Sequence, residues 1–146
     1  MTLARLAAAA ACIALVAGAT DPAFAQESPG AAIVERRALD HSIRLEQAGR
    51  EDEAMRALEN LLEEQPRSVS ALVLLRQMAE RAGEPRRALA RAEAAVGADD
   101  SDLPALRRVW IRSLQASGLQ DSALSAAQSW IRARPGQVAA YLELSG

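Results

Sequence analysis

The sequence predicts an all-α protein built from repeated pairs of short helices. After residue 25, Ala, Leu, Arg, Glu and Gln dominate, and the chain there has no Thr, no Phe and few Ile or Val. The abundant residues favour helices, and the scarce ones are typical of strands. Three glycines, Gly49, Gly83 and Gly118, recur at spacings of 34 and 35 residues. A fixed period of this length, with room for two helices, indicates a helical repeat.

The first 25 residues have the features of a secretory signal peptide. Arg5 is the only charged residue before Asp21, and residues 6–20 form an uncharged, mostly apolar run. A membrane-spanning helix needs about 20 apolar residues, so this run is short for one. The Ala-Phe-Ala triplet that ends at Ala25 supplies the small residues of a cleavage site. We expect cleavage after Ala25, which leaves Gln26 first; an uncleaved anchor is the alternative.

The compartment predicted by this segment is the bacterial periplasm. Cys12 lies inside the apolar run rather than at its end, so we do not expect a lipid to be attached there. The chain after the cleavage site has no Cys, and its core must hold it together without disulfides. With 17 basic and 19 acidic residues, the chain lacks the basic excess that favours nucleic acid or an anionic membrane surface. We expect no membrane insertion of the mature chain.

The mature chain divides into a short leader and a helical domain. We expect residues 26–34 to form a flexible leader and the start of a helix, and residues 35–146 to form the domain. Pro85 and Pro104 suit the first turn of a helix, and Ser68 suits an N-cap. Gly and Pro leave seven uninterrupted windows of helical length, at 31–48, 50–65, 67–82, 86–96, 105–117, 119–134 and 137–145.

Each repeat carries the same sequence of small and helix-ending residues. A Gly suited to end a helix is followed after five residues by Ala, and after four more by Leu or Ala. Eight residues beyond stands a Pro in two of the three units. These positions hold Gly49, Gly83 and Gly118; Ala54, Ala88 and Ala123; Leu58, Ala92 and Ala127; and Pro66, Asp100 and Pro135.

This pattern resembles the tetratricopeptide repeat (TPR) family over about residues 35–137. The resemblance implies an α-solenoid of about three helix-turn-helix repeats, followed by a C-terminal capping helix. In such a unit Gly makes the turn between the two helices, Ala lets them approach closely, and Pro ends the second helix. The expected repeats are 35–68, 69–103 and 104–137, and the expected cap is 138–146.

The resemblance also implies a non-enzymatic module that binds a partner peptide or helix in a concave groove. The first helix of each repeat lines that groove. The groove positions carried over to this chain are Arg36, Leu39, Ile43 and Gln47, then Val73, Gln77, Glu80 and Arg81, then Arg108, Arg112 and Gln115. The family's Lys/Asn clamp for a carboxylate is absent here. Arg36, Arg108 and Arg112 are suited to bind a carboxylate instead, and the alternative is that they lie on solvated helix faces.

Other functions have less support in the sequence. A self-assembling structural subunit of an envelope or secretion complex, stacked through the open end of the solenoid, is the alternative. His41 is expected to pack inward rather than to act as a base, and the aspartates at 99, 100 and 102 lack the pattern of a calcium loop. Trp110 and Trp130 are expected to fill the core rather than to anchor a partner. We expect no metal, no cofactor and no catalytic residue.

Overall fold

The computed structural model describes residues 29–98 and 103–136, which form six α-helices and no strand. The expected all-α class is confirmed. The helices are α1 (Pro29–Gln47), α2 (Glu51–Glu64), α3 (Val69–Arg81), α4 (Pro85–Gly97), α5 (Pro104–Ala116) and α6 (Gln120–Ala133). The expected signal peptide, its cleavage after Ala25, and the expected cap at 138–146 lie outside the described residues. Helix α1 begins within the expected leader.

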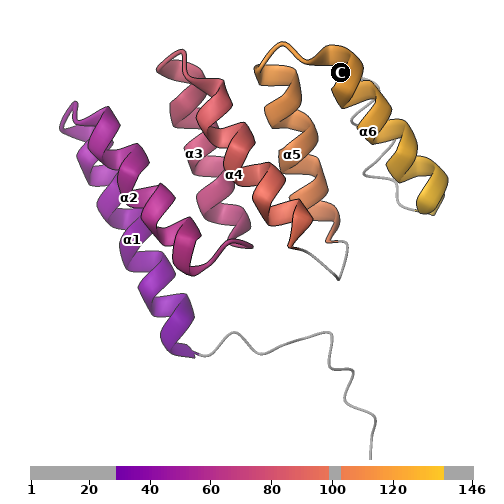
Figure 1. Ribbon diagram of the computed structural model, residues 1–146. Coiled ribbons are helices and arrows are strands. Elements are labelled where there is room, and N and C mark those ends of the chain that lie inside the picture. The colour runs from indigo at the N-terminus through magenta and orange to yellow at the C-terminus, as the bar shows by residue number, and fades with distance from the viewer. Residues whose placement is uncertain (1–28, 99–102, 137–146) are drawn as a thin grey trace, which may run out of the picture.

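The helices form three hairpins that follow one another in a row (Figure 1). Each helix packs against the one before it and the one after it in the chain. Helix α3 also contacts both α1 and α5, so the first helices of the three hairpins lie next to one another. The fold is therefore all-helical and repeat-like, and the three first helices share one surface.

The turn inside each hairpin has the same backbone geometry. Its glycine has a positive φ of 72° at Gly49, 75° at Gly83 and 76° at Gly118. In the first turn the amide of Arg50 donates to the carbonyl of Leu45 at 2.9 Å, and the other two turns repeat this bond. This arrangement is a Schellman motif, in which a left-handed residue ends the helix. Because that conformation costs a residue with a Cβ about 1–2 kcal/mol, the motif explains why glycine recurs here.

The three alanines of the repeat pattern are buried. Ala54, Ala88 and Ala123 are each 2% exposed or less. A methyl group at a buried position leaves room for a neighbouring helix to approach closely. Trp130, which is 1% exposed, fills the core of the third hairpin as expected.

The core continues along the row of hairpins instead of stopping at each one. One buried cluster runs through the first two hairpins and reaches Leu106 and Val109 of α5. A second cluster joins Leu89 of α4 to side chains of α5 and α6. Half-buried Trp110 packs against both clusters. Each hairpin therefore buries its apolar faces against its neighbours, as expected for a repeat architecture.

The starts of α3, α4 and α5 follow ordinary capping chemistry. Ser68 is the N-cap of α3, where its hydroxyl oxygen accepts a hydrogen bond from the amide of Ala71 at 3.2 Å. The same hydroxyl donates to the carboxylate of Glu35 in α1 and so links the first two hairpins. Pro85 and Pro104 stand in the first turns of α4 and α5, where a missing amide proton costs no helical bond.

Replacing Ala88 with leucine should destabilise the protein by about 1–3 kcal/mol, because the added atoms overpack the contact between helices. The matched control is Ala90→Leu, since Ala90 lies exposed on the same helix. Urea unfolding followed by circular dichroism measures both variants. Equal stability of Ala88→Leu and the unchanged chain would show that the two helices do not meet at this residue.

Candidate functional site

The expected groove residues lie on α1, α3 and α5, and their helices are in direct contact. We call this set of side chains the first-helix surface. Leu39, Val73 and Gln115 are half-buried in it. Its exposed members are Arg36, Ile43, Gln47, Gln77, Glu80, Arg81, Arg108 and Arg112.

Three members of the first-helix surface are apolar side chains on α1 and α3. Leu39 of α1 and Val73 of α3 pack against the buried core from this side and keep part of their surface outside it. Ile43, one turn beyond Leu39, is 37% exposed. A single exposed apolar side chain is ordinary, but Ile43 together with the half-buried Leu39 and Val73 gives a partner apolar surface on two adjoining helices.

Charged side chains link the first helices to one another. Arg81 of α3 forms an ion pair with Glu46 of α1, and its Nε donates to the carbonyl of Gln77 at 3.2 Å. Within α3, Arg76 forms an ion pair with Glu80. Arg81 therefore connects the first two hairpins, a role that the sequence pattern did not reveal. Neither Glu46 nor Arg76 was among the residues expected from the sequence to take part in the site.

The basic end of the first-helix surface is α5. This helix has three arginines and no acidic residue. Arg108 and Arg112 are spaced four residues apart and are both exposed. Arg112 also lines a surface cavity of about 660 Å³ at the end of α3, which it shares with Arg76, Glu80, Gly83, Pro85, Gln115 and Ala116. The first-helix surface is therefore mixed on α1 and α3, where apolar and charged side chains stand together, and it carries only polar and basic members on α5.

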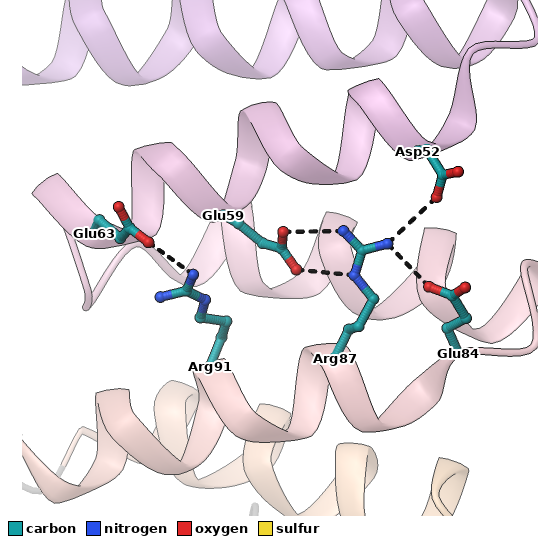
Figure 2. Close-up of polar contacts among 6 residues, drawn as sticks. All are labelled: Asp52, Glu59, Glu63, Glu84, Arg87 and Arg91. Carbon is teal, nitrogen blue, oxygen red and sulfur yellow. Dashed lines mark hydrogen bonds and ion pairs between the residues drawn. The ribbon is translucent and has the colours of Figure 1, made fainter.

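A separate set of ion pairs joins the second helices of the first two hairpins (Figure 2). Arg87 of α4 donates two hydrogen bonds, both at 3.0 Å, to the two carboxylate oxygens of Glu59 in α2. Its Nη1 donates to Glu84 at 2.9 Å and to Asp52 at 3.4 Å. The hydrogen bonds to Glu59, and then those to Glu84, raise the pKa of Arg87 above its ordinary value. We call these contacts the Arg87 cluster.

The Arg87 cluster belongs to the first two hairpins. One turn further along α4, Arg91 donates to Glu63 of α2 at 2.9 Å. The places of Arg87 and Arg91 are taken in α6 by Ser122 and Ala126, which carry no charge. The third hairpin therefore cannot form the same ion pairs with α4.

The acidic first turn of α2 is explained without a metal. Glu51, Asp52 and Glu53 stand at the N-terminal end of the helix, where the helix dipole favours negative charge. A hydrogen bond from Arg50 lowers the pKa of the Glu53 carboxyl. Among the described residues, no group of three His, Cys, Asp or Glu side chains is placed to hold a metal ion. The aspartates at 99, 100 and 102 lie outside those residues.

His41 is exposed on α1, so the expectation that it packs inward is wrong. The same repeat position in α3 holds Leu75, which is 0% exposed because it faces the hairpin before it. Helix α1 is the first helix in the described part of the chain, and no described hairpin covers its outer face. Its position at the start of the described row is therefore compatible with a polar residue there.

Comparison with known proteins gives no match, whether to a family model, to a curated protein or to a solved structure. None of the described helices is long and apolar enough to cross a membrane. A functional inference therefore depends on the residues of the first-helix surface and on the chemistry they offer.

Replacing Arg87 with glutamine should lower the free energy of unfolding by about 1–2 kcal/mol. This value lies between those of exposed and buried ion pairs, because Arg87 and Glu59 are 26% and 19% exposed. Adding Glu59→Gln should recover part of the loss, since it removes the carboxylate left without its partner. Arg86→Gln, at the exposed neighbouring position, is the control. Urea unfolding of the four chains would contradict the assignment if both single arginine variants lost the same stability.

Proposed function

We propose that this chain is a small TPR-like α-solenoid that binds a partner protein on the first-helix surface and performs no catalysis. The observation that carries the proposal is the set of exposed or half-buried apolar side chains Leu39, Ile43 and Val73 on two first helices that contact each other. Polar side chains border this group, and α5 adds positive charge beside it. A peptide or helix of the partner would lie across the three first helices, in the groove expected from the resemblance to the TPR family.

The TPR-like architecture is supported by the agreement of three independent turns. The period of 34 and 35 residues places Gly49, Gly83 and Gly118 in the same motif, with φ values that differ by only a few degrees. The contacts of α3 with both α1 and α5 are those of hairpins stacked in one direction. These features support a solenoid in preference to a closed helical bundle.

Export to the periplasm is the proposed setting of this function. The support comes from residues 1–25, with their short apolar run and their small residues before the expected cleavage site. The lack of Cys after Ala25 is compatible with an oxidising compartment, because no thiol would be exposed to oxidation there.

The alternative of end-to-end self-assembly has to bury charge, because the outer face of α1 carries three polar side chains beside the exposed Ile33 and Val34. Arg37, His41 and Arg44 stand there. The same repeat positions of α3 hold Ala71, Leu75 and Met78, which are buried. A second copy stacked against α1 would have to cover these three polar side chains, and burying unpaired charges is costly.

Replacing Ile43 with glutamate should weaken partner capture at least about tenfold, since the charge would lose its water without gaining a counter-ion. The control is Ile33→Glu, because Ile33 is more exposed, at 54%, on the same helix but outside the first-helix surface. Immobilised chains would be exposed to an envelope extract, and captured proteins would be quantified by mass spectrometry. Equal loss of the same captured proteins in both variants would contradict binding on this surface.

His41→Ala should leave partner capture unchanged, because the side chain points away from the first-helix surface's apolar group and lies exposed on α1. The same quantitative capture experiment measures it. A loss as large as that of Ile43→Glu would restore the alternative in which His41 contributes to the function.

Export should leave a protein whose first residue is Gln26. The measurement is the intact mass of the chain recovered from the periplasm after expression with its own residues 1–25. Replacement of Ala25 by a large residue such as leucine should block this cleavage, because signal peptidase requires small side chains there. Recovery of the uncleaved natural chain in the membrane fraction would favour the anchor instead.

A further inference from the structure

The third hairpin has a surface cavity at the positions where the second hairpin carries its bridging arginines. Ser122 and Ala126 of α6 stand at the repeat positions of Arg87 and Arg91. Both line a cavity of about 470 Å³ between α5 and α6, and we call it the Ser122 cavity. Its other lining side chains include Arg107 and Trp110 of α5 and Asp121 of α6.

Helices α4 and α6 bury the same repeat positions, so their surfaces correspond residue by residue. Ala88 in α4 and Ala123 in α6 are both 2% exposed. Arg87 stands one residue before the first of these alanines, and Ser122 stands one residue before the second. In Figure 2, Arg87 reaches from α4 toward α2, where it bonds Glu59. By this correspondence, Ser122 occupies the side of α6 that faces α4.

The carboxylate that would pair with an arginine in this cavity is present on α4. Glu59, which accepts two hydrogen bonds from Arg87, follows the buried Leu58. Glu93 follows the buried Ala92, at the same repeat position, and is exposed. Within the described part of the chain, the side chain of Glu93 has no ion pair or hydrogen bond. The junction of the second and third hairpins thus keeps the acceptor of the Arg87 cluster and lacks the donor.

The other groups that line the cavity also suit a guanidinium group. Asp121 adds a second carboxylate near the turn between α5 and α6. Trp110 contributes a half-buried indole ring, and guanidinium groups are attracted to the faces of such rings. Arg107, which would repel a cation, is as far in sequence from that turn as Ser129 is. It therefore lies about two helical turns away from Ser122 along the hairpin.

We propose that the Ser122 cavity binds an arginine side chain of a partner protein, which takes the place that Arg87 holds between α2 and α4. Glu93 accepts the hydrogen bonds of the guanidinium group, as Glu59 does. Arginine is favoured over lysine because its planar group donates two parallel hydrogen bonds to one carboxylate. Residues 137–146 contain no basic side chain and so do not supply the cation. This site belongs to the second helices and stands apart from the first-helix surface.

An arginine introduced at position 122 tests the geometry without any partner. Ser122→Arg should raise the unfolding midpoint by about 2–4 °C, because the chain then supplies the missing donor to Glu93. The gain should vanish when Glu93→Gln is added. Ser122→Gln, which brings a long side chain without charge, is the control. Thermal unfolding followed by circular dichroism measures these variants and Glu93→Gln alone, and an equal gain with and without Glu93→Gln would show that the ion pair does not form.

Binding of a foreign arginine is measured on the indole signals of Trp110 and Trp130 by two-dimensional NMR of the isotope-labelled chain. The probe is acetyl-Ala-Arg-Ala-amide, and the matched peptide has citrulline, which is similar in shape and uncharged. The arginine peptide should shift the Trp110 signal in a saturable way and leave the signal of buried Trp130 in place. Glu93→Gln should weaken binding at least about fivefold, since a charge-assisted pair is lost. Glu64→Gln, at an exposed carboxylate of α2, is the control.

The outcomes separate the possible occupants. A saturable shift with the arginine peptide alone, abolished by Ser122→Arg, supports the proposal. Equal binding of the citrulline peptide, or the lack of any shift with the arginine peptide, overturns it. If the chain self-associates in sedimentation and Ser122→Arg prevents this, an arginine of a second copy fills the cavity and the proposal of a separate partner is also wrong. None of these outcomes depends on whether a partner binds near Ile43.

Discussion

The reversal of the chain at three glycines with positive φ is the constraint on which the other features of this structure depend. Gly49, Gly83 and Gly118 join the two helices of each hairpin, and a buried alanine follows five residues later in each case. Close packing inside a hairpin leaves each second helix with a further apolar side that its own first helix does not cover. That side has to be buried by the next hairpin, and so a row forms instead of separate units.

Two kinds of contact hold the row together, and they differ along its length. Apolar side chains connect all three hairpins, because the buried clusters extend from α1 to α6. The Arg87 cluster adds a directional, charged link between the first two hairpins only. The first-helix surface, on which we propose that a partner binds, is a consequence of the same stacking: α3 touches α1 on one side and α5 on the other.

Local chemistry made the hairpins predictable from the sequence, and long-range contacts account for what was missed. A glycine in a turn and a serine at an N-cap act within a few residues, so Gly83 and Ser68 could be assigned from the sequence alone. The ion pair of Arg81 with Glu46 joins two residues that are 35 positions apart in the sequence and belong to different hairpins. A local sequence pattern cannot predict such a pair. His41 is exposed where no described hairpin lies before α1. The sequence pattern of a single repeat does not show whether a neighbouring hairpin covers that repeat.

The charges of the Arg87 cluster also bear on how freely such hairpins can be exchanged. Repeats that meet only through apolar side chains of similar volume can be duplicated or reordered with little loss. The second hairpin is different, because Arg87 and Arg91 require the carboxylates that the first hairpin supplies at Glu59 and Glu63. The third hairpin has Ser122 and Ala126 at the repeat positions of Arg87 and Arg91, and these uncharged residues need no carboxylate partner. The first two hairpins therefore form a matched pair through the Arg87 cluster, and exchanging either one alone would leave charged side chains without these partners.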